Sequence, residues 1–141
     1  MTESASVRVS IEDGEWAGWS LWPAEPFERI AGPFYLRPGD DPVCAFRVAE
    51  QHLNAGGSAH GGCLMTFADF AIFGLSEAQW SGRSAVTVSM NCDFLGPARI
   101  GDLVEAMRQS IHATRTMIFV SGLAVSGSRP VLSFNGIIKL I

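Results

Sequence analysis

The stretch HGGCLMTFADFAIFGL, residues 60–75, decides the fold of this 141-residue chain. From Cys63 to Leu75 it is apolar on nearly every side, which is typical of a helix buried all round. It has none of the period-two alternation of a strand, and it is long enough for several helical turns. The sequence therefore predicts one substantial helix from residue 60 to about residue 79.

The chain downstream of this helix has the pattern of strands. After Ser81-Gly82, the residues Val86, Val88 and Met90 alternate with polar ones through residues 86–94, which predicts a half-buried strand. Three further strands are predicted at residues 103–112, 116–125 and 131–141, separated by short turns.

Upstream of the helix, residues 32–36 and 43–49 flank a turn that contains Pro38-Gly39, which predicts a hairpin. One helix among about six strands cannot cover both faces of a parallel sheet. The predicted class is therefore α+β, with an antiparallel sheet wrapped around one central helix. We expect a single domain over residues 1–141, with residues 1–26 as an N-terminal flap.

The flap carries three tryptophans, Trp16, Trp19 and Trp22, at a spacing of three. This spacing predicts that they share one face of a turn or helix. Packing of the flap onto the domain is one interpretation, and a lid over a pocket is the other.

Composition excludes some functions and favours others. Hydrophobic residues make up 48% of the chain and charged ones 17%, which favours a surface covered by a second subunit. The net charge of −4 and the scattered basic residues argue against nucleic acid as a partner. No segment resembles a signal peptide or a membrane span, so we expect a cytoplasmic protein without a membrane partner. The three cysteines lack metal-type spacing, and neither a metal nor a redox cofactor is expected.

Asp69 is the exception within the apolar helix. Burying a carboxylate without partners costs several kcal/mol, roughly, so this side chain is expected either to pair structurally or to do chemistry. The helix start, His60-Gly61-Gly62, offers backbone N–H groups that two residues without Cβ leave accessible, and the helix dipole there favours negative charge. This start is a candidate oxyanion hole.

Nine residues separate His60 from Asp69, which places them on opposite sides of the helix and about 13 Å apart. Within one chain they cannot converge. A two-fold dimer with antiparallel helices would bring Asp69 of one chain to the His60-Gly61 amides of the other. The sequence therefore predicts a homo-oligomer, a dimer or a dimer of dimers, with a shared site.

The segment Asn54-Ala-Gly-Gly-Ser-Ala-His60-Gly61-Gly62, followed by Asp69 and by Val88-Ser-Met90-Asn91, resembles the hot-dog-fold acyl-CoA thioesterases. The nearest subgroup is similar to the phenylacetate-pathway thioesterases and the human acyl-CoA thioesterase-like proteins. The resemblance covers roughly residue 27 to the C-terminus.

This resemblance implies roles for individual residues. Asp69 would be the general base or nucleophile, the Gly61 amide would polarise the thioester carbonyl, and Asn54 would position the water or the thioester. His60 would shape the helix start, next to Gly62 in the substrate-binding turn. Further along the chain, Thr87 falls where the family places a hydroxyl that orients the water or the carboxylate. Arg115 lies in a turn that, in relatives, approaches the nucleotide end of coenzyme A. One turn after Asp69, Phe73 stands where some relatives carry a hydroxyl residue.

Thr87 poses a difficulty, because a valine face turned toward the helix would point Thr87 away from Asp69. The implied function is hydrolysis of an acyl-CoA thioester, with coenzyme A as part of the substrate. Two alternatives stay open: a domain that binds acyl-CoA without catalysis, as a sensor or partner module, and a dehydratase acting on hydroxyacyl thioesters.

Overall fold

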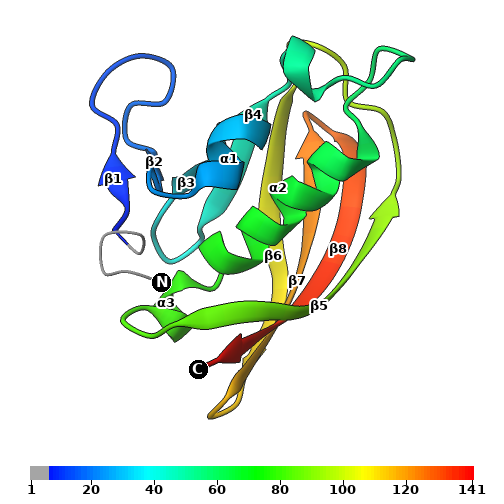
Figure 1. Cartoon of the computed structure of the whole chain (residues 1–141). Coiled ribbons are helices and arrows are strands. Elements are labelled where there is room, and N and C mark those ends of the chain that lie inside the picture. Colours follow the sequence, from blue (N-terminus) through cyan, green and yellow to red (C-terminus); the bar gives the residue numbers. More distant parts are fainter. Residues whose placement is uncertain (1–6) are drawn as a thin grey trace.

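A curved antiparallel sheet wraps around one long helix, α2 (Gly61–Gly74), in the computed structural model, which describes residues 7–141 (Figure 1). The strands that form the main part of the sheet are β3 (Tyr35–Arg37), β4 (Val43–Arg47), β5 (Ala85–Phe94), β6 (Leu103–Ala113), β7 (Met117–Ser126) and β8 (Arg129–Leu140). Two short strands, β1 (Val9–Ser10) and β2 (Ser20–Leu21), extend it. The α+β class is confirmed, with eight strands where about six were predicted.

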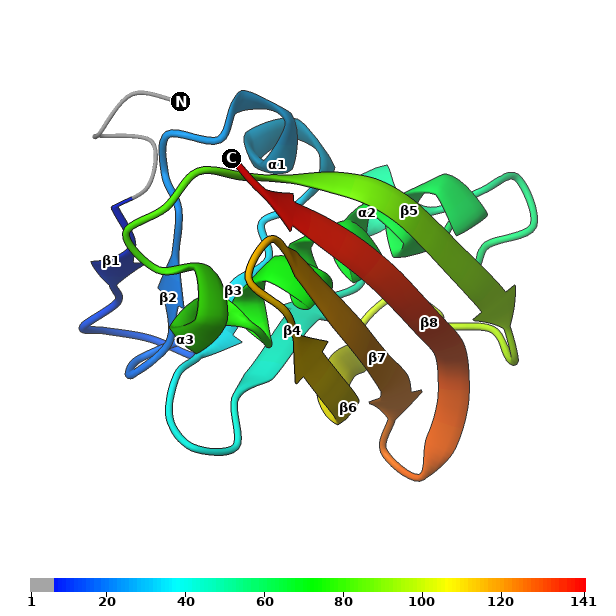
Figure 2. The same cartoon turned by 90° about the horizontal axis from the view of Figure 1, so that it is seen from below.

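The strand order is β1-β2-β3-β4-β6-β7-β8-β5. The predicted hairpin is present, with Leu36 of β3 opposite Cys44 of β4. β5 follows α2 in the chain but pairs with β8 at the far edge, so one side of β5 has no neighbouring strand within residues 7–141 (Figure 2). This edge strand runs alongside α2, and that placement matters for the site.

The helix lies very close to the sheet. A Cβ built on Gly136 of β8 would stand 2.6 Å from Cδ1 of Ile72, so only glycine lets α2 approach here. Leu64, Phe67 and Ala71 are among the buried residues of the same helix. One apolar core therefore joins α2 to the concave face of the sheet.

The predicted long helix is wrong in its last part, because α2 ends at Gly74 and a separate short helix, α3 (Glu77–Trp80), follows. The Ser76 hydroxyl donates to the Ile72 carbonyl at 2.5 Å, and the Trp80 indole N–H donates to the Phe73 carbonyl at 2.8 Å. These side chains satisfy carbonyl groups at the helix end, so the chain can turn there.

The three tryptophans do not share one face. Trp16 stacks on Tyr35 with ring centroids 4.0 Å apart and meets Trp19 edge-on at 5.1 Å. Trp22 is only 7% exposed and packs instead against Phe70 of α2 and against Trp80. Trp16 and Trp19 thus pack beside β3, whereas Trp22 lies in the core.

A short helix, α1 (Pro26–Ala31), follows Trp22 and lies beside α2 (Figure 1, Figure 2). A 3-10 turn, η2 (Glu50–His52), precedes the loop that leads into α2. The three cysteines are free thiols, of which Cys44 is buried. No helix in residues 7–141 has the length and apolar character needed to cross a membrane.

Candidate active site

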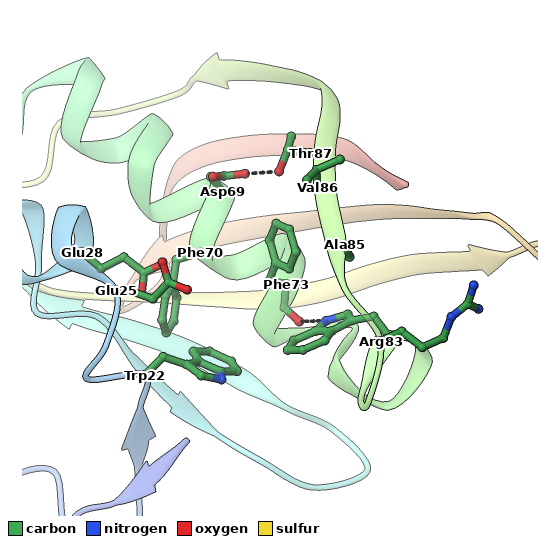
Figure 3. A pocket seen from close by; sticks show the side chains of 11 residues that line it. Trp22, Glu25, Glu28, Asp69, Phe70, Phe73, Arg83, Ala85, Val86 and Thr87 are labelled. Carbon is green, nitrogen blue, oxygen red and sulfur yellow. Dashed lines mark hydrogen bonds between the residues drawn. The ribbon is translucent and has the colours of Figure 1, made fainter. Parts of the chain in front are cut away.

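Asp69 lies in the middle of α2 on the side that faces β5, where it is half-buried. The Thr87 hydroxyl of β5 donates a hydrogen bond of 2.6 Å to Oδ1 of Asp69 (Figure 3). A short O–H···O⁻ bond to a carboxylate is among the stronger hydrogen bonds in proteins. This bond fixes the direction of the carboxylate relative to the edge strand.

A β-bulge explains how Thr87 reaches Asp69. The pairing of β5 with β8 shifts between Thr87 and Ser89, so that Val88 is an extra residue. Before the bulge Thr87 points toward α2, and after it Met90 does, which interrupts the predicted alternation. Val86 and Val88 are 45% and 49% exposed, so the valine face does not turn toward the helix and the difficulty over Thr87 does not arise.

A cleft of about 340 Å³ opens beside this pair, between α1, the C-terminal half of α2, α3 and the start of β5. Its apolar lining is aromatic and comprises Trp22, Phe70, Phe73 and Trp80. A concave, mainly apolar cleft with a few polar groups is the usual form of a small-molecule site. The volume is at the lower end of that range, which favours a compact group over a whole nucleotide.

Phe73 lies one helical turn after Asp69 on α2. Its ring lines the cleft, and the carboxylate of Asp69 receives a side-chain hydrogen bond from Thr87 alone among residues 7–141. The cleft wall next to the carboxylate is therefore apolar on the Phe73 side.

Three carboxyl groups line the cleft: Asp69 and, from the α1 side, Glu25 and Glu28. Burial, followed by the charges of Glu25 and Asp69, raises the pKa of Glu28 from 4.5 to about 8. Sequence reasoning missed Glu25 and Glu28, because charged residues in a short helix near the N-terminus are typical of a solvated surface. Their only sequence signal is proximity to Trp22, whose burial the sequence does not reveal.

At the start of α2, His60 is the N-cap residue, and its Nδ1 accepts a hydrogen bond of 2.8 Å from the Gly62 N–H. The Gly62 amide is therefore occupied, although the sequence suggested that both glycine amides were available. The Gly61 N–H has no hydrogen-bond partner within residues 7–141. A neutral His60 bonded in this way carries its proton on Nε2.

Asn54 organises the loop before α2. Its side-chain oxygen accepts from the N–H groups of Gly56 at 2.9 Å and Ser58 at 3.2 Å, and it lies exposed. This oxygen is thus committed to the loop, whereas the side-chain NH₂ has no partner within the described part of the chain. The NH₂ group is the part of Asn54 that remains available to a ligand.

A single chain does not bring all the predicted residues together. Asn54, His60 and Gly61 lie at the N-terminal end of α2, and none of them lines the cleft that contains Asp69 and Thr87. Eight residues of helix between Gly61 and Asp69 correspond to about 12 Å. The separation expected from the sequence is therefore present within one chain.

Arg115 lies exposed in the turn between β6 and β7, away from the cleft lining. Its backbone carbonyl accepts a hydrogen bond of 3.4 Å from Nη1 of Arg83, which does line the cleft. Arg83, which lines the cleft, and Arg115, which does not, therefore lie next to each other, and sequence reasoning identified only Arg115. Within residues 7–141, no three His, Cys, Asp or Glu side chains gather as a metal site.

Comparisons with known proteins agree with this fold. The thioesterase superfamily family model matches residues 56–132. A Pseudomonas aeruginosa protein named as an esterase is 35% identical over 123 residues, which cover 85% of this chain and 92% of that protein. Human acyl-coenzyme A thioesterase 13 is 31% identical over 101 residues, 70% of this chain and 71% of that protein.

Among solved structures, the E. coli PaaI protein from the phenylacetic acid degradation operon superposes with a TM-score of 0.72. It is 26% identical in sequence, and the match covers 84% of this chain and 86% of that one. The fold is therefore the hot-dog fold. The chain belongs to the thioesterase superfamily, and its class of activity is thioester hydrolysis.

Proposed function

We propose that this protein hydrolyses acyl-CoA thioesters at a site shared between two subunits of a homodimer, in the cytoplasm. The observation that carries the proposal is the Asp69–Thr87 pair, a carboxylate held in place at the mouth of an aromatic cleft. The similarity to human acyl-coenzyme A thioesterase 13 supports coenzyme A esters as the substrate class.

The shared site follows from the separation of the groups along α2. A carboxylate alone activates water, but the oxyanion that forms on the thioester carbonyl needs a donor close to it. The Gly61 N–H, which has no hydrogen-bond partner within residues 7–141, suits this role, yet it belongs to the other end of the helix. With α2 of two subunits side by side and antiparallel, Asp69 of each subunit would meet Gly61 of its partner.

The surface around β5 supports such a dimer. β5 is a sheet edge, and exposed apolar side chains lie on it and on the loop that follows, among them Val86, Val88, Phe94 and Leu95. Met65 of α2 is 38% exposed. An unpaired strand with apolar surroundings is a site for pairing with another chain.

In the proposed mechanism, Asp69 either takes a proton from a water that attacks the thioester carbonyl carbon or attacks that carbon itself. The Gly61 N–H of the partner subunit stabilises the negative oxygen of the tetrahedral intermediate. The C–S bond then breaks, and the coenzyme A thiolate takes up a proton. When water is the nucleophile, the acyl group leaves directly as a carboxylic acid; when Asp69 attacks, the acyl group stays on Asp69 as an anhydride, which a water molecule then hydrolyses to the carboxylic acid. One water is consumed for each ester.

The other residues have supporting roles in this proposal. Thr87 orients the carboxylate, and the Asn54 side-chain NH₂ helps to hold the thioester or the water. His60 shapes the turn at Gly62 against which the substrate lies. Arg115, with Arg83 beside it, contacts phosphate groups of coenzyme A. No metal or redox group takes part in the proposed reaction.

The test is thiol release from a panel of aromatic, short-chain and long-chain acyl-CoA esters by the wild-type protein and by Asp69→Asn. We expect the wild type to release coenzyme A and the variant to lose turnover by at least about a hundredfold while keeping its oligomeric state. Tight binding of the esters without thiol release by the wild type would contradict the proposal and support a sensor. Formation of an alkene from a hydroxyacyl ester would support a dehydratase.

A further inference from the structure

The wall of the cleft opposite Thr87 is acidic. Glu25 and Glu28 come from α1, whereas Thr87 and Val86 come from β5 across the cleft (Figure 3). Asp69 lies between the two walls, on α2. A molecule that fills the cleft next to Asp69 must therefore lie close to the carboxyl group of Glu28.

Within residues 7–141, no salt bridge balances this acidic wall. Glu28 and Glu25 form no ion pair within residues 7–141. Arg83 also lines the cleft, but its guanidinium extends away from Glu28 (Figure 3) and Nη1 bonds to the Arg115 carbonyl. With Asp69 ionised, the cleft interior is negative before any acyl group enters.

The groups around Glu28 come from several elements. Glu25 stands at the start of the same helix, Asp69 faces it from α2, and the thiol of Cys44 belongs to β4. Burial raises the pKa of that thiol, so Cys44 is neutral. The pKa of Glu28, raised to about 8 by burial and by the charges of Glu25 and Asp69, places its change of charge just above neutral pH.

We propose that Glu28 is a specificity-determining residue, which makes the cleft accept uncharged acyl groups and reject acyl groups that carry a carboxylate. This inference rests on the proposed function, because it places the acyl group of the ester in the cleft. The aromatic side chains Trp22, Phe70 and Phe73 contact the uncharged acyl group. A carboxylate on the acyl group would meet Asp69, Glu25 and, once it is ionised, Glu28, and no ion pair within residues 7–141 balances these carboxyl groups.

The preference depends on pH in a defined direction. Below pH 8 Glu28 is largely protonated, and its neutral carboxyl group tolerates an apolar neighbour. Above pH 8 it adds a further negative charge to the cleft, and repulsion of an anionic acyl group increases. One added charge at close range in a partly desolvated cleft corresponds to a change in preference of about tenfold.

The experiment compares two six-carbon esters, hexanoyl-CoA and adipoyl-CoA, which differ in a terminal carboxylate. For the wild type, we expect the ratio of their kcat/KM values to favour hexanoyl-CoA and to rise about tenfold from pH 7 to pH 9. For Glu28→Gln the ratio should stay constant over the same range. Because both esters share coenzyme A and the chemical step, the ratio cancels effects of pH on catalysis and on stability.

The matched control is Glu12→Gln, which removes one negative charge from the exposed surface outside the cleft. Its ratio should rise with pH as in the wild type. A wild-type ratio that is independent of pH, or a rise that persists in Glu28→Gln, would overturn the inference.

The failure of this inference can be distinguished from failure of the proposed function. If the wild type hydrolyses hexanoyl-CoA but shows no pH-dependent ratio, the inference alone is wrong. If neither ester is hydrolysed, the proposed function is wrong, and the same ratio measured from dissociation constants by calorimetry still tests Glu28. A carbon-13 titration of the wild-type Glu28 carboxyl group reports its protonation without any variant.

Discussion

The Thr87 hydroxyl reaches the Asp69 carboxylate at 2.6 Å because β5 carries an extra residue, Val88, immediately after Thr87. The bulge turns Thr87 toward α2 and leaves Val88 exposed. Bulges often direct a side chain into an active site. In this molecule the bulge of the edge strand β5 lies beside Asp69, the charged residue of the apolar helix α2.

This relationship leads to a test of Thr87. Thr87→Val keeps the shape of the side chain but removes the donor, and we expect kcat to fall about tenfold to a hundredfold, since a hydrogen bond to a charged group contributes about 1.5–3 kcal/mol. Thr87→Ser retains a hydroxyl group and should restore most of the activity. If kcat measurements show the valine variant to be as active as the serine variant, the hydrogen bond has no role in turnover.

A second prediction concerns the N-terminal tryptophans. Trp22 lines the cleft, whereas Trp19 packs with Trp16 beside β3. Trp22→Phe enlarges the cleft, so we expect kcat/KM to shift several-fold toward bulkier acyl groups across a panel of esters. Trp19→Ala is the matched control and should leave the order of preference unchanged. The same shift in both variants would mean that the flap acts as a whole.

A third prediction concerns the close contact of helix and sheet. Gly136→Ala places a Cβ 2.6 Å from Cδ1 of Ile72, and we expect a loss of about 1–3 kcal/mol in the free energy of unfolding. Ile72→Val removes that Cδ1 atom. In urea denaturation, the double variant should lose about 1 kcal/mol less than the sum of the two single variants. Simple additivity would show that the two side chains do not compete for space.

A fourth prediction follows from the carboxyl group of Glu28. Its pKa is about 8 in the folded protein and near 4.5 in the unfolded chain, so the folded state holds the extra proton between these values. Stability contributed by this proton is therefore lost as pH rises from about 4.5 to about 8. Because the group is partly exposed, we expect Glu28→Gln to be more stable than the wild type by only about 1–2 kcal/mol at pH 9.

Equal stability of the two proteins is expected at pH 4, where Glu28 is protonated in both states. Denaturant melts at several pH values measure the difference directly. A constant difference over the whole range would mean that Glu28 titrates normally.

Much of the fold could be predicted because its signals are local. The apolar stretch around Phe67 indicates a buried helix, Pro38-Gly39 indicates a turn, and the period-two segments indicate strands. The helix end and the bulge could not be predicted. Each depends on contacts made only in the folded chain: the Ser76 and Trp80 side chains at the helix carbonyls, and the register of β5 against β8.

The candidate site could be predicted in part, because one of its residues is chemically unusual for its surroundings. Asp69 stands out because its neighbours are apolar, and the glycines at the helix start stand out as accessible amides. Glu28 and Arg83 do not stand out, because a charged residue in a polar segment is ordinary until tertiary packing places it in a cleft. The hydrogen bond from the Gly62 N–H to His60 Nδ1 likewise depends on the rotamer of His60, which the sequence does not reveal.

The shared site can be tested with two variants that are each expected to be inactive. Gly61→Pro removes the proposed oxyanion donor, and proline suits this position because Gly61 is the first residue of α2 and the preceding His60 has an extended backbone. A Cβ on Gly61 would make only ordinary contacts with Phe94 at 3.5 Å. Gly61→Ala retains the N–H group and is the control for added bulk.

The most direct measurement is the activity of a heterodimer in which one chain carries Asp69→Asn and the other carries Gly61→Pro, purified through two different affinity tags. If each site takes Asp69 from one chain and Gly61 from the other, one of its two sites is intact. We therefore expect about half of the wild-type kcat per dimer. A heterodimer as inactive as its two parent homodimers would contradict the shared site.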